Sequence, residues 1–197
     1  MNGELPVEIA QAYPGDLANR LTELGYIGLF QQAGETYLQH IWNTPDAPEA
    51  LEILAVSSNA PMLARFLAAE ILFFQGDVHR VEKYKQELAE VYMAALADNF
   101  TEAANSWGLP SVTVGLAGEH LLAIGEPMLS KLLNLLDNDK RVYYEGSQEA
   151  TLGQRYGYRV KDLAAYFIGR VRNIPFELEE DPGRRDKAIE KLKRAVK

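Results

Sequence analysis

Apolar residues recur at helical spacing along most of the chain, whereas the strict alternation typical of strands is sparse. A first helix is predicted to begin at Asp16, a residue type favoured at the N-cap, and to end near Gly25. A second helix is predicted from Leu29 to Trp42, since prolines follow soon after it. The pattern therefore indicates an all-α protein.

One apolar pattern repeats along the chain. LAAEILF at Leu67–Phe73 reappears as LAGEHLL at Leu116–Leu122 and as LAAYFIG at Leu163–Gly169, at spacings of 49 and 47 residues. This period is just above the usual range for stacked helix pairs. Such pairs repeat because one pair alone cannot bury its apolar face. We expect the three segments to be second helices of successive pairs, to lie side by side and to bury their first Leu and first Ala.

Each repeat is predicted to pair two helices. In the second repeat a long amphipathic helix follows Asp77 and ends near Phe100, and its partner begins at the N-cap Ser111. After the last pair, Asp181 followed by Pro182 predicts a terminal helix that caps the exposed end. We therefore predict one all-α domain over 1–197, with a helix pair at 1–47, repeat units at 48–76, 77–125 and 126–174, and a capping helix at 181–197.

The third repeat carries a family resemblance. LLNLLDND followed by RVKDLAA resembles the HEAT repeat, and ARFLAAEIL in the first repeat is similar. The resemblance covers Pro48 to Arg172 and implies a right-handed α-α superhelix of three to four armadillo-type helix pairs. It also implies stacking contacts between Arg159 and either Asp137 or Asp139. The turn in the third unit is far longer than the family pattern.

That turn is an insert, KRVYYEGSQEATLGQRYGY, between Asp139 and Arg159. Inserts of this length are usually functional or disordered, and its tyrosines argue against disorder. It is predicted to form either a loop with a small hairpin or a helical turn capped by Ser147.

The insert also provides the candidate binding residues. Tyrosine combines rigid contact area with a polar tip, which favours recognition; alternatively, the tyrosines pack the insert onto the helices below it. The candidates are the side chains suited to contact a ligand or partner: Tyr143, Tyr144, Ser147, Glu149, Tyr156 and Arg159.

Charge and composition limit the partners. The net charge of −8 disfavours a nucleic-acid or anionic membrane surface. Residues 184–197, however, carry a balance of +5, which either complements the dipole of the terminal helix or binds an acidic partner. The absence of Cys excludes disulfides. The segment MNGELPVEIAQAYPGD has no basic region before an apolar run, so a cytoplasmic protein is favoured unless a leader has been removed.

Motifs for catalysis, cofactors and metals are absent from the sequence. His40, His79 and His120 are scattered and lack a metal-ligand spacing, and His120 is expected to be a structural histidine. There is no nucleophile elbow, no phosphate-binding loop and no dinucleotide fingerprint. Gly115 and Gly118 are expected to allow close helix packing. We therefore predict no catalytic, cofactor-binding or metal-binding residue.

Two glutamates occupy the same position in successive repeats. Glu70 and Glu119 each lie on an otherwise apolar helix, where a buried carboxylate needs a partner. We expect them to form a structural ladder; the alternative is a pair of acids that line a groove for acid–base chemistry.

Two functional hypotheses follow. The first is a non-enzymatic protein- or peptide-binding module, a scaffold or adaptor that uses its concave helical face or the 140–158 insert. The second is a small-ligand-binding protein or hydrolase-like enzyme with a pocket under the insert, lined by Glu119, Tyr144, Glu149 or Arg159.

Overall fold

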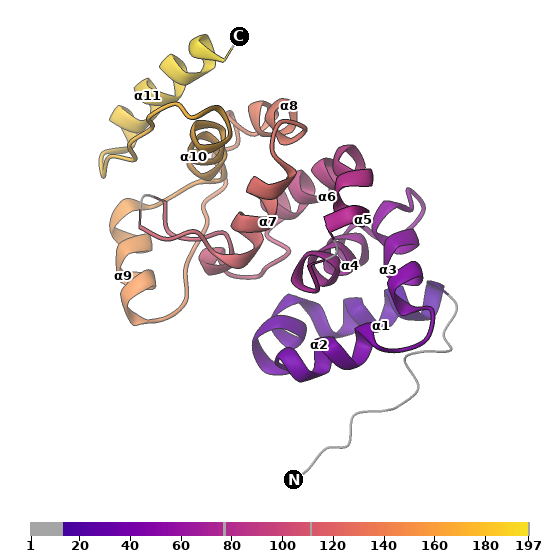
Figure 1. Cartoon of the computed structure of the whole chain (residues 1–197). Helices are drawn as coiled ribbons and strands as arrows, with labels where there is room; N and C mark the ends of the chain where they lie inside the picture. The colour runs from indigo at the N-terminus through magenta and orange to yellow at the C-terminus, as the bar shows by residue number, and fades with distance from the viewer. Residues whose placement is uncertain (1–13, 77, 111, 197) are drawn as a thin grey trace. The chain divides into compact units, whose positions relative to one another are not determined.

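The computed structural model describes residues 14–76, 78–110 and 112–196 (Figure 1). Within these ranges the protein is all-helical, with eleven α-helices, a π-helix and a short 3₁₀ helix, and it contains no strand. The chain divides into two compact units, Met1–Val91 and Tyr92–Lys197. The predictions for the first thirteen residues and for Asp77 and Ser111 as helix starts lie outside the described residues.

The first unit begins with the helices α1 (Pro14–Ile27) and α2 (Glu35–Trp42), joined by the π-helix η2 (Gly28–Gln32). The predicted break at Gly25 is confirmed, because Gly25 has a φ of 62°, which only glycine adopts readily. The predicted helix from Leu29 to Trp42 is in fact divided. Gly34 stands just before α2 with a φ of 76° and starts a new helix.

The core of the first unit is built around α4 (Met62–Phe74), which packs against α1 and against α3 (Ala47–Val56). Every residue of α4 from Ala64 to Leu72 is buried, as its nearly continuous apolar sequence predicts. The ring of Phe66 stacks on Tyr26 at 5.9 Å. The buried Arg65 donates its Nε to the carbonyl of Ala55 at 3.2 Å, which joins α4 to α3.

The long helix predicted after Asp77 is two helices, α5 (Val78–Lys83) and α6 (Lys85–Asp98), separated at Tyr84. Ion pairs hold α5 to α3: Glu52 accepts hydrogen bonds from Arg80 at 2.6 Å and from Lys83 at 2.9 Å. These contacts with α3 were not visible in the periodicity, which continues across Tyr84.

The core of the second unit surrounds Trp107, which follows the 3₁₀ helix η3 (Ala104–Ser106) and is almost fully buried. Its ring meets Tyr92 and Phe167 edge-on at 6.4 and 6.5 Å. Helix α7 (Leu116–Ile124) approaches this core through Gly118, where an added Cβ would lie 2.4 Å from the carbonyl oxygen of Trp107. The close packing expected at Gly118 is therefore confirmed.

Helix α7 begins later than the sequence predicted. Its first residue is Leu116, because Gly115 precedes it in an extended conformation. A Cβ added at Gly115 would lie 2.4 Å from the carbonyl oxygens of Asn105 and Ser106, so only glycine fits there. Leu116 therefore lies in the first turn and is only half-buried, so the prediction of its burial is wrong. The burial predicted for Leu67 and Leu163 is confirmed, as is that of the three following alanines, Ala68, Ala117 and Ala164.

The late start of α7 also separates the two glutamates. Glu70 is fully buried in the middle of α4, whereas Glu119 is exposed in the first turn of α7. The predicted ladder of equivalent carboxylates is therefore wrong. His120 is buried on α7, as expected for a structural histidine.

Helices α8 (Met128–Asn134) and α10 (Val160–Arg172) pack as the predicted third pair, and α10 also contacts α7. The stacking of these helices on α4 would join the two units and stays a prediction, as do the repeat boundaries.

The terminal helix α11 (Pro182–Ala195) begins at the N-cap Asp181, whose carboxylate accepts a hydrogen bond from the backbone amide of Arg184 at 2.7 Å. It contacts α10 and buries Ile189 and Leu192, as predicted.

Candidate functional site

The insert consists of two arms and a helix, α9 (Ser147–Tyr156), between them. The arms pair in an antiparallel bridge, since Val142 N donates to Tyr158 O at 3.0 Å and Val160 N donates to Lys140 O at 2.9 Å. The short pairing and the helix each match one of the predicted alternatives, although α9 is much longer than one turn.

The first arm is fixed to the loop at η3. Ala104 N donates to Tyr143 O at 2.9 Å. The side-chain amide of Asn105 then pairs with Glu145 in both directions: Nδ2 donates to the carbonyl at 2.9 Å and Oδ1 accepts from the amide at 2.8 Å. Backbone held on both sides in this way loses little further conformational freedom when a partner binds.

Adjacent tyrosines on this arm point in opposite directions, as expected for extended backbone. The ring of Tyr144 is 6% exposed, meets Tyr158 edge-on at 6.1 Å and donates its hydroxyl to Gly108 O at 3.0 Å. Gly153 of α9 makes room for this ring, because a Cβ there would lie 2.5 Å from it. Burial raises the pKa of Tyr144 well above its usual value. Tyr143 is 65% exposed.

Two further tyrosines, Tyr156 and Tyr158, lie at the C-terminal end of the insert. Tyr156 stacks on Tyr158 with ring centroids 5.1 Å apart and is half-buried. Burial, above all, raises the pKa of Tyr158 to about 12, so its hydroxyl stays protonated. Arg185 of α11 lies against the Tyr158 ring at 5.7 Å. The second arm therefore packs the insert onto α11.

Arg159 is the hub of an ion-pair cluster. Its guanidinium donates to both carboxylate oxygens of Asp162 at 2.9 Å, to Asp186 at 2.8 Å and to Asp139 at 3.3 Å. These bonds, above all those to Asp162, raise the pKa of Arg159 above its usual range. Hydrogen bonding to Lys161 in turn lowers the pKa of Asp139. Arg159 thus pairs with Asp139, one of the two partners that the family resemblance implied, whereas Asp137 pairs with Lys193 at 2.7 Å.

A second arginine lies beneath this cluster. Arg185 is completely buried and donates to the carbonyls of Glu179, Glu180 and Tyr156 at 2.7 to 2.8 Å. Its Nε lies 3.2 Å from the equally buried Asp162. The burial of Arg185 was not predicted, because this residue stands in a basic run whose other members are mostly exposed. Its only signal was its place one turn before Ile189 on the apolar face.

The two polar candidates lie at the other end of α9. Ser147 is exposed at its first turn and Glu149 is half-buried beside it. A ten-residue helix is about 15 Å long, so these side chains are far from Tyr156 and Arg159. The six predicted site residues are therefore not one cluster. Tyr144 and Arg159 make hydrogen bonds inside the fold, and Tyr143, at 65%, is the most exposed aromatic residue among those that the structure describes.

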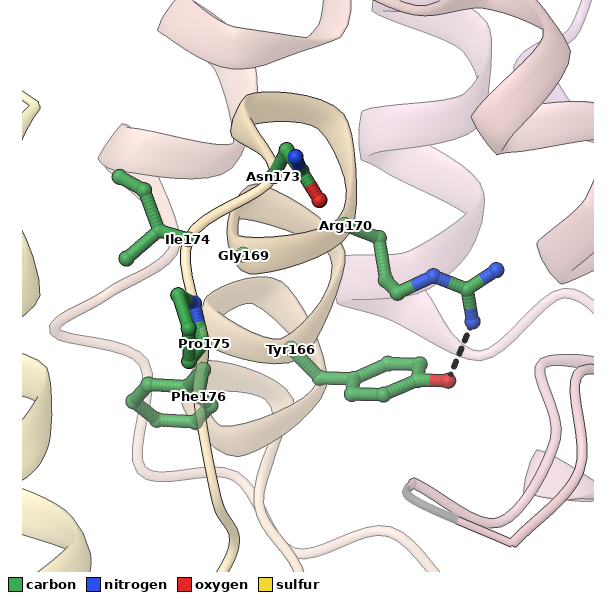
Figure 2. A pocket seen from close by; sticks show the side chains of 7 residues that line it. All are labelled: Tyr166, Gly169, Arg170, Asn173, Ile174, Pro175 and Phe176. Atoms are coloured by element: carbon green, nitrogen blue, oxygen red, sulfur yellow. Dashed lines mark hydrogen bonds between the residues drawn. The ribbon is translucent and has the colours of Figure 1, made fainter.

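A cleft of about 240 Å³ lies outside the insert, at the end of α10 (Figure 2). Arg170 and Tyr166 form one wall, joined by a hydrogen bond of 2.8 Å from the guanidinium to the phenol oxygen. The opposite wall is Ile174, Pro175 and Phe176. No pattern in the amino-acid sequence indicated this cleft. It depends on Gly169, where a Cβ would lie 2.9 Å from the carbonyl oxygen of Ile174.

Comparisons with known proteins give no relative. No protein-family model matches the chain, and no curated protein or solved structure matches it. Across the described residues, no group of three or more His, Asp or Glu is placed to hold a metal ion. In the same residues, every helix is too short or too polar to span a bilayer.

Proposed function

We propose that this protein is a non-enzymatic module that binds a protein or peptide partner, with the first arm of the insert as the principal contact. Tyr143 is the anchor of this surface. It presents an aromatic ring at 65% exposure on an arm that is hydrogen-bonded along its length. Aromatic residues of this kind dominate the binding energy of many interfaces.

The fixed arm is the observation that carries the proposal. A flexible loop loses conformational entropy when it is ordered by a partner, whereas a loop already held by Asn105 and Ala104 does not. A single exposed aromatic residue is common on protein surfaces, and what distinguishes Tyr143 is the fixed backbone that presents it. Tyr143 therefore resembles a preorganised contact residue.

The engagement of the other candidates favours binding over catalysis at the insert. The hydroxyl of Tyr144 and the guanidinium of Arg159 already make internal hydrogen bonds, so neither group is available to a substrate without rearrangement. The hydrolase-like alternative needs those groups to face a pocket.

We also propose that the helix pairs α3–α4 and α8–α10 are units of a right-handed HEAT-like superhelix. Each pair is packed within its own unit, and the second helices of both carry the LAA pattern. Solenoids of this kind offer extended binding surfaces.

The test is a comparative capture experiment. Immobilised wild type, Tyr143→Ala and Ile53→Ala are exposed to lysate of the source cells, and the bound proteins are quantified by mass spectrometry. Ile53 is a matched control because it is also exposed, at 56%, but lies in the first unit. We expect partners that are retained by wild type and Ile53→Ala and lost by Tyr143→Ala. Equal recovery by all three proteins would contradict the proposal.

A further inference from the structure

One face of α11 carries a row of cations. Arg184, Lys187, Lys191 and Arg194 are exposed and spaced at i, i+3, i+7 and i+10, which places them on one side of the helix. Arg184 pairs with Glu179 at 2.9 Å. Within the part of the chain that the structure describes, Lys187, Lys191 and Arg194 make no ion pair or side-chain hydrogen bond. These three residues are called the cationic row below.

The acidic side chains of α11 are occupied by other cations. Asp186 pairs with Arg159 at 2.8 Å and with Lys161 at 3.0 Å. Glu190 pairs with Lys193 at 2.9 Å. These two carboxylates therefore pair with cations outside the cationic row, although both also line the surface around the row. The unpaired charges of α11 on this surface are those of the cationic row.

The helix dipole explains only part of this row. Its favourable interaction with cations is confined to about the last turn of a helix. Arg194 lies in the last turn of α11, but Lys187 and Lys191 lie in its middle. Two of the three cations therefore have no local electrostatic reason to stand there.

An apolar groove runs beside the cationic row. It has a volume of about 370 Å³ and lies between α11 and the segment that follows α10. One wall is Ile174, Pro175 and Phe176, which Figure 2 shows on that segment, and the other includes Ala188 and Ala195 of α11. Glu177 and Glu179 also line the groove, and Glu179 is paired with Arg184. Lys191 lines both this groove and a shallow hollow of about 410 Å³ over the cationic row.

We propose that this surface binds an acidic, amphipathic peptide segment of another protein. The carboxylates of the peptide pair with Lys187, Lys191 and Arg194, and an apolar side chain enters the groove between Phe176 and Ala195. Charge-assisted hydrogen bonds are the stronger kind, and Lys191 stands where both types of contact meet. The surface is separate from Tyr143 and does not depend on the function proposed for the insert.

A peptide fits better than a polyanionic surface. The protein carries −8, which repels an extended polyanion with many charges more strongly than a short peptide with a few carboxylates. The cationic row has only three free charges, and the groove beside it accepts an apolar side chain, which a phosphate backbone does not supply.

The test uses a fluorescent synthetic peptide rich in Glu and Leu, with its binding to the full chain followed by fluorescence anisotropy. Two control peptides replace all Glu by Gln or all Leu by Gly. The variant Lys187→Glu/Lys191→Glu is compared with Arg20→Glu/Arg172→Glu, which changes the net charge equally at sites outside the groove. Ala195→Trp fills the groove without a change of charge. Thermal unfolding checks folding, and Lys187→Gln/Lys191→Gln replaces the first variant if that one is unfolded.

We expect the Glu/Leu peptide to bind wild type, and Lys187→Glu/Lys191→Glu to weaken that binding by about tenfold or more. Ala195→Trp should weaken it too, and both control peptides should bind poorly. Equal weakening by Arg20→Glu/Arg172→Glu would show long-range charge alone and overturn the proposal. The proposal is also overturned if the peptide does not bind. It is overturned as well if phosphatidylserine vesicles or an oligonucleotide displace the peptide by binding to Lys187 and Lys191.

Discussion

Arg185 is a fully buried cation in the second unit, and three backbone carbonyls and Asp162 surround it. Removing one member of a buried ion pair leaves the other uncompensated, which is far more destabilising than the loss of a surface pair. The guanidinium also joins three segments, namely α11, the end of α9 and the chain before α11. Replacing Arg185 should therefore destabilise all three segments.

We predict that Arg185→Met lowers the free energy of unfolding by about 3–5 kcal/mol, as measured by urea denaturation. The control is Arg184→Met, at the neighbouring position. Arg184 is exposed and its pair with Glu179 is a surface pair, so its loss should destabilise the protein far less than that of Arg185. Similar losses in both variants would mean that Arg185 does not hold the segments together.

The three repeat leucines differ in burial and should differ in energy. Leu67→Ala and Leu163→Ala should each lower the free energy of unfolding by about 2–5 kcal/mol, because both side chains are fully buried. Leu116→Ala should be clearly milder, since Leu116 is half-buried. A loss at Leu116 as large as those at the other two positions would contradict the late start of α7.

At the scale of elements, α3 and α5 are joined by a carboxylate whose protonation state matters. The hydrogen bond from Lys83, chiefly, lowers the pKa of Glu52 from 4.5 to about 2 in the folded protein. The unfolded chain therefore binds a proton at higher pH than the folded one. The stabilisation from Glu52 is complete above about pH 4.5 and is lost as the pH falls toward 2.

We predict that Glu52→Gln makes the first unit less sensitive to acid. Between about pH 5 and pH 3, the melting temperature of wild type should fall more steeply than that of Glu52→Gln. The paired control is Glu49→Gln, because Glu49 is mostly exposed, at 62% of its side chain, and contacts only Arg80. Parallel pH profiles for wild type and Glu52→Gln would contradict the assignment.

The terminal helix is a second element with a defined role. Deletion of residues 182–197 would expose the apolar surface that Ile189 and Leu192 cover and would leave Asp162 without Arg185. We therefore expect aggregation or a clear drop in melting temperature, measured by light scattering and differential scanning fluorimetry. A soluble truncated protein with unchanged melting temperature would mean that α11 is a free arm.

Elements were predictable where local signals and tertiary packing agree. The start of α11 at Asp181 and Pro182 and the burial of α4, whose sequence is a nearly continuous apolar run, were both correctly predicted. The start of α7 was not, because Gly115 lies against the carbonyls of Asn105 and Ser106, in a loop about ten residues earlier. Helix α9 was predicted only as one capped turn, because the contact of its Gly153 with the ring of Tyr144 does not show in local periodicity.

At the scale of the whole molecule, the candidate site belongs to the second unit and combines one exposed ring with a fixed arm. The insert could be located from the sequence, but the sequence does not show that Tyr143 is exposed and Tyr144 buried. The directions of these two side chains depend on the hydrogen bonds of the arm with Tyr158 and Ala104. Long-range hydrogen bonds of this kind leave no trace in local periodicity. The all-α class was predictable from periodicity alone; the superhelix stays a prediction, and the orientation of Tyr143 was not predictable.

The most direct test of this account is a calorimetric titration of the captured partner into wild type, Tyr143→Ala and Asn105→Ala. Tyr143→Ala removes the anchor, whereas Asn105→Ala keeps it and releases Glu145 from its side-chain pairing. We predict that Tyr143→Ala weakens binding by about 1–2 kcal/mol or more and that Asn105→Ala weakens it less, with a more unfavourable entropy. Wild-type affinity for Tyr143→Ala, with the protein folded, would contradict the central claim.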